Sequence, residues 1–176
     1  MKERILSYLS HIPQIGERVF VAPGAWVIGN VVLGNHTSIW FNTVLRGDVN
    51  VIQVGENTNV QDLSMLHNTE RSPLIIGANV SIGHSVTLHG CTINDSCLIG
   101  MGATVLDDAI IGKNSLVAAN SLVPPKKVFP EGVMIMGNPA KVVRELTPEE
   151  KHMVANHYKA YLGYKEIYLK DKTFTL

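Results

Sequence analysis

The chain carries a regular spacing of aliphatic residues. Thirteen of the 16 steps that join 17 successive Val, Leu or Ile residues are six residues long. A small or β-branched residue usually stands two places before each of them, and strand side chains two apart share one face. The series is Val21, Val27, Leu33, Ile39, Leu45, Val54, Val60, Leu66, Ile76, Ile82, Leu88, Ile93, Ile99, Val105, Ile111, Val117 and Val123. This pattern predicts an all-β solenoid, a parallel β-helix of hexapeptide repeats in which three hexads make one coil.

Irregular steps in the series predict where loops leave the coil. A step of nine residues follows Leu45, a step of ten follows Leu66, and a step of five follows Leu88. The two long steps predict loops around residues 48–51 and 68–73. Loops on a rigid scaffold often carry function, so chemistry is expected nearby.

The repeat and its end predict one domain over residues 1–176. The β-helix is expected at about 15–125, followed by an extended return segment, rich in proline, over 126–146. A Thr-Pro-Glu-Glu run then supplies an N-cap, a proline at the first helical position and a capping-box glutamate. It predicts a C-terminal α-helix over 147–170.

Composition narrows the function classes. Lys plus Arg and Asp plus Glu each number 15, so no global field points to nucleic acid or an anionic membrane. No apolar run approaches the ~18 residues of a membrane span, and no secretory signal is recognisable. A cytoplasmic location is therefore expected. The two cysteines, Cys91 and Cys97, each stand two places before an inward aliphatic residue and are predicted to be core residues.

Polar residues gather in two predicted columns. Arg46, His67 and His89 directly follow three leucines that should stack in consecutive coils, so their side chains should project outward in one column. By the same count, Asp62 and His84 form a second column on a neighbouring face. The sequence therefore predicts two groups of outward polar side chains on one solenoid.

The three histidines of these columns suggest a metal site. Three imidazoles and a water molecule make a catalytic zinc set, with Zn–N bonds of about 2.1 Å. Side chains on different faces of a triangular prism diverge, so one chain cannot easily supply all three. A head-to-tail contact that closes as a ring brings the columns together, and a homotrimer is its natural form. His67 and His89 would come from one subunit and His84 from the next.

Four segments carry a resemblance to a known family. They are Leu45-Arg46-Gly47-Asp48, Asn59-Val60-Gln61-Asp62, Leu66-His67, and residues 83–91, GHSVTLHGC. They resemble the γ-class carbonic anhydrases, and more closely their short bacterial relatives of the YrdA and PaaY type. The resemblance covers about residues 12–170. It implies a left-handed β-helix, a homotrimer, a metal at each subunit interface, and reversible hydration of carbon dioxide to bicarbonate by a hydroxide bound to that metal.

The resemblance assigns roles to individual residues. His67, His84 and His89 match the metal ligands, and Gln61 matches the residue that hydrogen-bonds the metal-bound water. Zinc is the expected ion, although nitrogen and water ligands select weakly and Fe²⁺ or Co²⁺ fits the same set.

A charged network is implied around the ligands. Arg46, Asp48 and Asp62 match residues of this network, and its Arg–carboxylate pairing is thought to join subunits as much as to serve catalysis.

The chain departs from the family pattern at several positions. Val49 stands where the type enzymes carry a glutamate, and the loop after the first histidine is short. Glu70 is the candidate substitute for the proton-shuttle carboxylate of that loop. Tyr161 is the candidate for a helix residue that approaches the site, with Asn156 and Tyr158 as alternatives. A positioned acid–base group is worth roughly 10²–10⁴-fold, so a slow or condition-dependent anhydrase is predicted.

Other functions remain compatible with the sequence. Hexapeptide-repeat acyltransferases use acyl-CoA, share this solenoid, and carry a segment like residues 137–141 near its end. They need one histidine as a base, whereas three at ligand spacing favour the metal hypothesis. A binding or assembly protein with a metal that only stabilises the trimer is a third candidate, and the same metal site could also hydrolyse a thioester.

Overall fold

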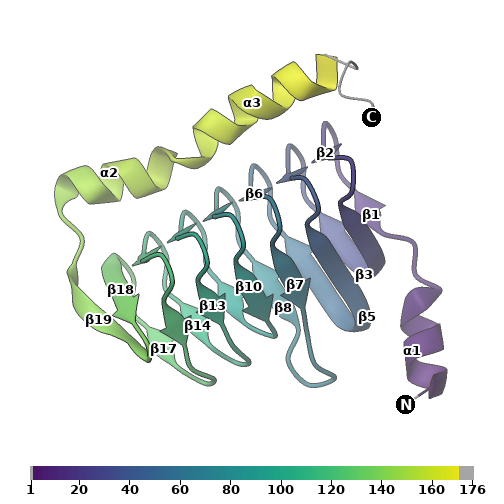
Figure 1. The fold of residues 1–176 in the computed structure, drawn as a ribbon, viewed down its shortest axis with the longest axis horizontal. Helices are drawn as coiled ribbons and strands as arrows, with labels where there is room; N and C mark the ends of the chain where they lie inside the picture. The colour runs from purple at the N-terminus through teal and green to yellow at the C-terminus, as the bar shows by residue number, and fades with distance from the viewer. Residues whose placement is uncertain (1, 171–176) are drawn as a thin grey trace.

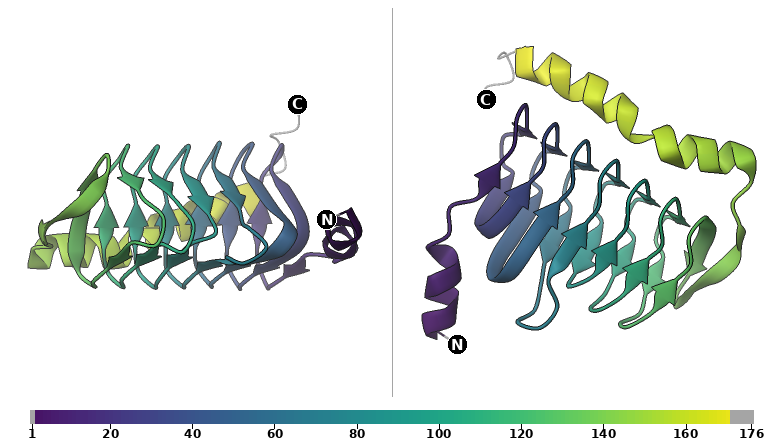
Figure 2. Two further views of the ribbon diagram at one scale, coloured as in Figure 1. Left: turned by 90° about the horizontal axis from the view of Figure 1, so that it is seen from below. Right: turned by 180° about the vertical axis from the view of Figure 1, so that it is seen from behind.

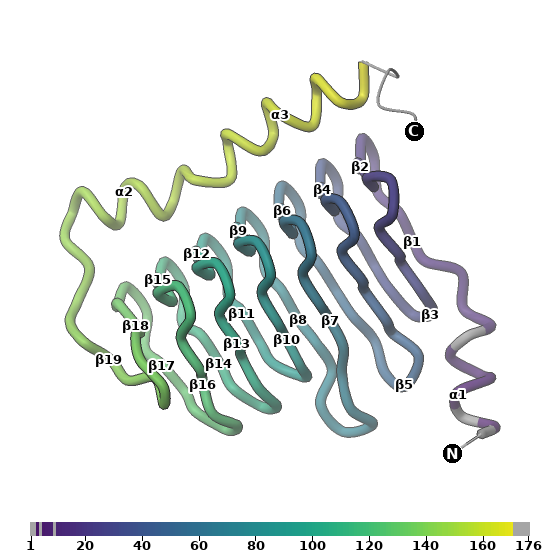
Figure 3. Tube along the Cα trace, in the orientation of Figure 1, coloured from purple at the N-terminus to yellow at the C-terminus, as the bar shows by residue number. Residues whose placement is uncertain are grey.

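A computed structural model describes residues 2–170, and it is a parallel β-solenoid with helices at both ends (Figure 1). Successive coils stack along one axis, and each coil contributes short strands to three walls (Figures 2 and 3). The fold class predicted from the repeat is confirmed.

Strands of successive coils pair in register to build the walls. The first wall is an 8-stranded sheet of β2 (Phe20–Val21), β4 (Ser38–Ile39), β6 (Asn59–Val60), β9 (Ser81–Ile82), β12 (Leu98–Ile99), β15 (Leu116–Val117), β18 (Val133–Gly137) and β19 (Ala140–Glu145). All its neighbours are parallel except β18 and β19, which are antiparallel.

The second and third walls belong to one 11-stranded sheet, because β3 (Trp26–Leu33) and β5 (Val44–Val54) run continuously through both. The second wall also contains β7 (Met65–His67), β10 (Thr87–His89), β13 (Thr104–Val105) and β16 (Leu122–Val123). The third wall adds β1 (Gln14–Ile15), β8 (Leu74–Ile76), β11 (Thr92–Ile93), β14 (Ile110–Ile111) and β17 (Val128–Phe129).

The predicted aliphatic series forms the core from Leu33 onward, whereas Val21 in the first coil is 41% exposed. Every member from Leu33 to Val123 is buried, with at most 3% of its surface exposed. Leu66 lies opposite Leu45 on one side and Leu88 on the other, as the hexad count predicts. Cys91 and Cys97 are buried free thiols, as expected. Burial raises the pKa of Cys97 to about 12 and that of Cys91 further, so neither is a reactive thiolate near neutral pH.

The solenoid is longer than the pattern predicts. Residues 126–146 are not simply an extended return, because β17 and β18 continue the parallel ladders. Phe129 and Ile135 take the inward positions there and are buried. The sequence pattern missed this coil because Phe129 replaces the expected aliphatic residue and Pro130 follows it. Only β19 turns back, antiparallel to β18.

The long step after Leu45 is a bulge within a strand. β5 runs from Val44 to Val54 beside β3, but its register with β3 stops at Gly47 and resumes at Ile52, so residues 48–51 form an irregular insertion at the predicted place. The step after Leu66 does form a loop between β7 and β8, and it extends beyond the end of the second wall (Figure 1).

The C-terminal helix predicted over 147–170 is two helices. The capping box is present as predicted, with Thr147 and Glu150 bonded reciprocally at the start of α2 (Pro148–Asn156). A break at His157 separates α2 from α3 (Tyr158–Lys170). An N-terminal helix, α1 (Lys2–Leu9), lies against β3 and β5 and was not predicted. Among the described residues, no helix is long and apolar enough to cross a membrane.

An aromatic cluster joins α3 to the first coils. Trp40 is only 5% exposed, and its ring meets those of Tyr161 and Tyr168 edge-on at 5.3 Å. Phe20 and Phe41 complete the cluster. The Nζ of Lys165, whose side chain is 1% exposed, donates to the carbonyl of Arg18. The helices therefore return along the corner between the first and second walls.

Candidate metal centre

The first histidine column lies at the far edge of the second wall, at the ends of β7 and β10. His67 and His89 are register partners, and the Nδ1 of His67 lies 3.1 Å from the Nε2 of His89. On its other side, the Nε2 of His67 lies 3.0 Å from an oxygen of Asp48. Arg46 donates to the second oxygen of Asp48 at 2.6 Å. The predicted column therefore forms a connected chain of four side chains.

The ionisation of this chain follows from its burial and charges. Burial lowers the pKa of His67, and the hydrogen bond to Asp48 only partly offsets it, so the neutral ring is favoured. For Asp48, burial acts to raise the pKa. Hydrogen bonds from Arg46 and His67 outweigh burial and hold that pKa below its ordinary value.

A further carboxylate, Asp107, completes the column and was missed in the sequence. It follows β13 on the next coil, and its Oδ1 lies 2.6 Å from the Nδ1 of His89. The count that aligned the histidines also aligns Asp107 with Gly90, directly after His89. Continuing that count by one coil is the signal that could have found it.

The carboxylates decide which ring nitrogens carry protons. Asp48 accepts a hydrogen bond from Nε2 of His67, and Asp107 accepts one from Nδ1 of His89. In the neutral rings, the two nitrogens that face each other across 3.1 Å then both present lone pairs. Such an arrangement repels unless a cation lies between the nitrogens, so the pair is suited to binding one.

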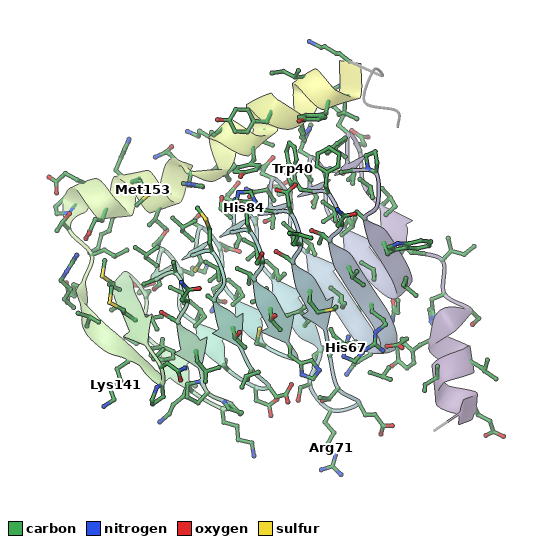
Figure 4. All side chains as sticks on the ribbon, in the orientation of Figure 1. Trp40, His67, Arg71, His84, Lys141 and Met153 are labelled. Carbon is green, nitrogen blue, oxygen red and sulfur yellow. The ribbon has the colours of Figure 1, made fainter. Side chains whose placement is uncertain are left out.

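The second column lies at the opposite edge of the second wall, beside α3. His84 follows β9, and its Nδ1 lies 2.7 Å from an oxygen of Asp62, which follows β6 one coil earlier. Figure 4 shows His84 near Trp40 and the helices, whereas His67 lies at the far edge. The predicted columns therefore both form, and they diverge as predicted.

A single chain does not bring the three histidines together. Across residues 2–170, no three His, Cys, Asp or Glu side chains are grouped so that they could hold a metal ion. Within the described part of the chain, the facing pair of His67 and His89 thus has no third protein ligand grouped with it.

Gln61 and Tyr161 lie on the side of the second column. Gln61 is 3% exposed, and its Nε2 donates to Asn59 at 3.0 Å. Tyr161 lines a cavity of about 420 Å³ between α3 and the first coils, together with Asp62, Trp40, Phe41, Tyr164, Ile167 and Tyr168. Burial, followed by the charge of Asp62, raises the pKa of Tyr161 to about 12.

The shuttle candidate Glu70 lies in the loop between β7 and β8. Its side chain is exposed, and its carbonyl accepts a hydrogen bond from the Nδ2 of Asn50 at 3.2 Å. Asn50 also bonds the carbonyl of Thr69, so β5 fixes the base of the loop. Glu70 therefore lies on the same edge as His67, in the loop that begins directly after His67.

Comparison with known proteins decides the family. A model described as bacterial transferase hexapeptide (six repeats) matches residues 90–125. The chain is 43% identical to a carbonic anhydrase of Geobacillus kaustophilus, over 83% of this chain and 80% of the relative. It is 42% identical to Protein YrdA of Escherichia coli, over 96% of each. The mitochondrial γ carbonic anhydrase 2 of Arabidopsis thaliana is 41% identical over 96% of this chain. The chain belongs to the γ-class carbonic anhydrase family.

Two further findings concern how far the relatives' activities apply to this chain. The chain spans only 63% of the length of the Arabidopsis relative. A solved structure described as a hexapeptide transferase family protein, from Anaplasma phagocytophilum, is also 39% identical with a TM-score of 0.86, covering 89% of this chain and 92% of that one. Names within this fold therefore include transferases as well as anhydrases, and the site chemistry must decide between them.

Proposed function

We propose that this chain reversibly hydrates carbon dioxide to bicarbonate at a divalent metal ion held between subunits of a homotrimer. The observation that carries the proposal is the facing pair of His67 and His89, whose ring protons are both held by carboxylates. Nitrogen ligands with one open position suit zinc, and Fe²⁺ or Co²⁺ fits the same donors. A cytoplasmic location remains a prediction.

The spacing of the pair fits a metal. Two nitrogens bound to tetrahedral zinc at about 2.1 Å lie about 3.4 Å apart. The nitrogens of His67 and His89 are 3.1 Å apart, so an adjustment of a few tenths of an ångström would accommodate the ion. Each ring also has the carboxylate partner that ordinarily orients a metal-binding imidazole. His84 has the same arrangement through Asp62.

The position of His84 supports the proposed trimer. Its column and the His67–His89 column occupy opposite edges of the second wall, so one edge can meet the other only on a different molecule. A head-to-tail contact of this kind closes as a ring. Exposed apolar side chains near this wall support the contact, namely Leu63 at 64%, Met65 at 43% and Met101 at 60% exposed.

When bound, the metal would supply acidity, because it lowers the pKa of a coordinated water from ~15.7 to about 7. The residues of the chain would then bind, orient and move protons. Asp48, which Arg46 fixes in place, would orient the ring of His67 outward by accepting a hydrogen bond from its Nε2. Gln61 has its Nε2 engaged with Asn59, so it would act through Oε1 as an acceptor.

Residues on the exposed side of the site would transfer the proton released by hydration to bulk water. Glu70 is solvent-exposed and would pass the proton to bulk water from the loop beside His67. Tyr161, with a pKa of about 12, stays neutral at physiological pH and would act as a hydrogen-bonding group rather than as a base. With Val49 in place of a carboxylate beside Asp48, we expect slow proton export.

The test combines metal content with hydration activity. Untagged protein is expected to hold about one metal ion per chain and to hydrate carbon dioxide in a stopped-flow indicator assay. His84→Ala should lose both the metal and the activity. His152→Ala is the matched control, because His152 is an exposed histidine on α2, outside both columns.

Contrary outcomes separate the candidate functions. No metal in the wild-type protein, even after reconstitution, would exclude the anhydrase proposal. The acyl-CoA-dependent acyltransferase is favoured by the transferase repeats at residues 90–125, and acyl transfer without metal would support it. Bound metal with no hydration activity would instead support the binding or assembly protein, with the metal serving only the trimer.

A further inference from the structure

Each of the three histidines has one ring nitrogen in contact with a carboxylate. Asp107 contacts His89 in the way that Asp48 contacts His67 and Asp62 contacts His84. We propose that Asp107 is a positioning residue that fixes the proton of His89 on Nδ1 and thereby directs its Nε2 toward the metal. This inference rests on the proposed function. Its basis is the 2.6 Å contact between Asp107 Oδ1 and His89 Nδ1, the shortest of the three carboxylate–histidine contacts.

The backbone of the next coil fixes Asp107 in place. The carbonyl of Asp107 accepts from the N–H of Lys126 at 2.8 Å, and the N–H of Asp108 donates to the carbonyl of Gly90 at 2.8 Å. The N–H of Gly90 donates in turn to the carbonyl of His67 at 3.0 Å. Four successive coils are thus tied together beside the histidine pair, so the carboxylate approaches His89 from a rigid support.

Gly90 leaves the space that the carboxylate needs. A Cβ at position 90 would lie 2.7 Å from the Oδ1 of Asp107 and 2.9 Å from the Cβ of Ser72. Gly90 also has a φ of +53°, which disfavours residues with side chains. Any side chain here would push Asp107 away from His89, so the glycine and the aspartate act together.

The consequence for metal binding is specific. Without Asp107, the ring of His89 can rotate or carry its proton on Nε2, which is the atom that faces His67. A protonated Nε2 cannot bind a metal. Loss of such an orienting partner typically weakens metal binding by about 10–100-fold. The remaining ligands keep their own carboxylates, so the fold and the other two histidines should be unaffected.

The test compares Asp107→Asn with Asp108→Asn in the full-length protein. Asp108 is the adjacent aspartate, exposed and at φ +60°, a conformation that asparagine tolerates well. Zinc affinity is measured by competition with a chelator. We expect Asp107→Asn to weaken zinc binding about 10–100-fold, and Asp108→Asn to leave it unchanged. Equal affinities in the two variants would overturn the proposal.

A second readout needs no metal and separates the two proposals. The nitrogen chemical shifts of the His89 ring report its tautomer in metal-free protein. Wild type should show Nδ1–H, and Asp107→Asn should shift toward Nε2–H. If wild type binds no zinc, the proposed function fails, and this tautomer comparison still decides the role of Asp107. An unchanged tautomer would refute that role.

Discussion

Both edges of the second wall present histidines bonded to carboxylates, two at the far edge and one at the near edge, but different forces hold them. At the far edge, His67 and His89 are positioned by the ladder between β7 and β10 and lie over the stacked leucines. At the near edge, His84 lies beside α3, which is attached through an aromatic cluster around Trp40. The ladder fixes a pair of ligands in one chain, whereas the helix edge offers one histidine to a neighbour.

Disrupting the aromatic cluster should separate the two edges most strongly. Trp40→Ala removes a buried indole that contacts Tyr161 and Tyr168, and we expect a loss of about 3–5 kcal/mol in the free energy of unfolding. Proteolysis and chemical denaturation should show α3 detached. The contact between His67 and His89 should persist, as judged by their ring nitrogen shifts. Loss of that contact as well would mean that the edges are not independent.

The matched change at the far edge is Leu88→Ala. Leu88 is completely buried beneath His89, and its truncation should cost about 2–5 kcal/mol. Here the histidine pair should loosen while α3 stays attached. If Leu88→Ala released α3 first, the proposed division of the two edges would be wrong.

A smaller effect is expected from the start of α2. The Thr147 side chain accepts from the N–H of Glu150, and the Glu150 carboxylate accepts from the N–H of Thr147. Thr147→Ala should destabilise the protein by about 1 kcal/mol, measured by urea denaturation. The metal content should not change, because α2 lies away from both columns. Thr147→Ser, which retains the hydroxyl, is the control.

The smallest effect concerns pH at the break between α2 and α3. Burial lowers the pKa of His157 below 6.5, so the unfolded chain takes up a proton before the folded chain does. The stability from neutral His157 is therefore complete above pH 6.5 and is lost as the pH falls toward the lower folded pKa. Denaturation midpoints at pH 7.5 and 5.5 should differ less in His157→Phe than in wild type. An equal difference would contradict this assignment.

Much of the fold follows from the sequence because the solenoid repeats one local rule. Aliphatic residues at six-residue steps define the core and, through it, the register that aligns His67 with His89 and Asp62 with His84. The rule failed where the residue type or the step length departs from the six-residue repeat. Phe129 stands where an aliphatic residue was expected, so the last coil was not recognised. The long step after Leu45 was predicted as a loop, and it is a bulge within β5.

The parts of the fold and site that the sequence analysis missed have two origins. Asp107 follows from the spacing once the count is continued by one coil, which aligns it with the residue directly after His89. Other features depend on packing. The burial of Lys165 arises from packing against the first coils, where its Nζ donates to the carbonyl of Arg18. No local sequence pattern predicted this burial or the break at His157. The functional roles of the histidines remain predictions that depend on a second chain.

The most direct test of the intersubunit site is complementation between two inactive variants. His67→Ala and His84→Ala are co-expressed with different tags, and trimers that carry both tags are isolated. A mixed trimer of either composition has one interface with both residues intact, so about one third of the wild-type metal content and hydration activity should return. Absence of both metal and activity from these mixed trimers would contradict a site shared between neighbouring subunits.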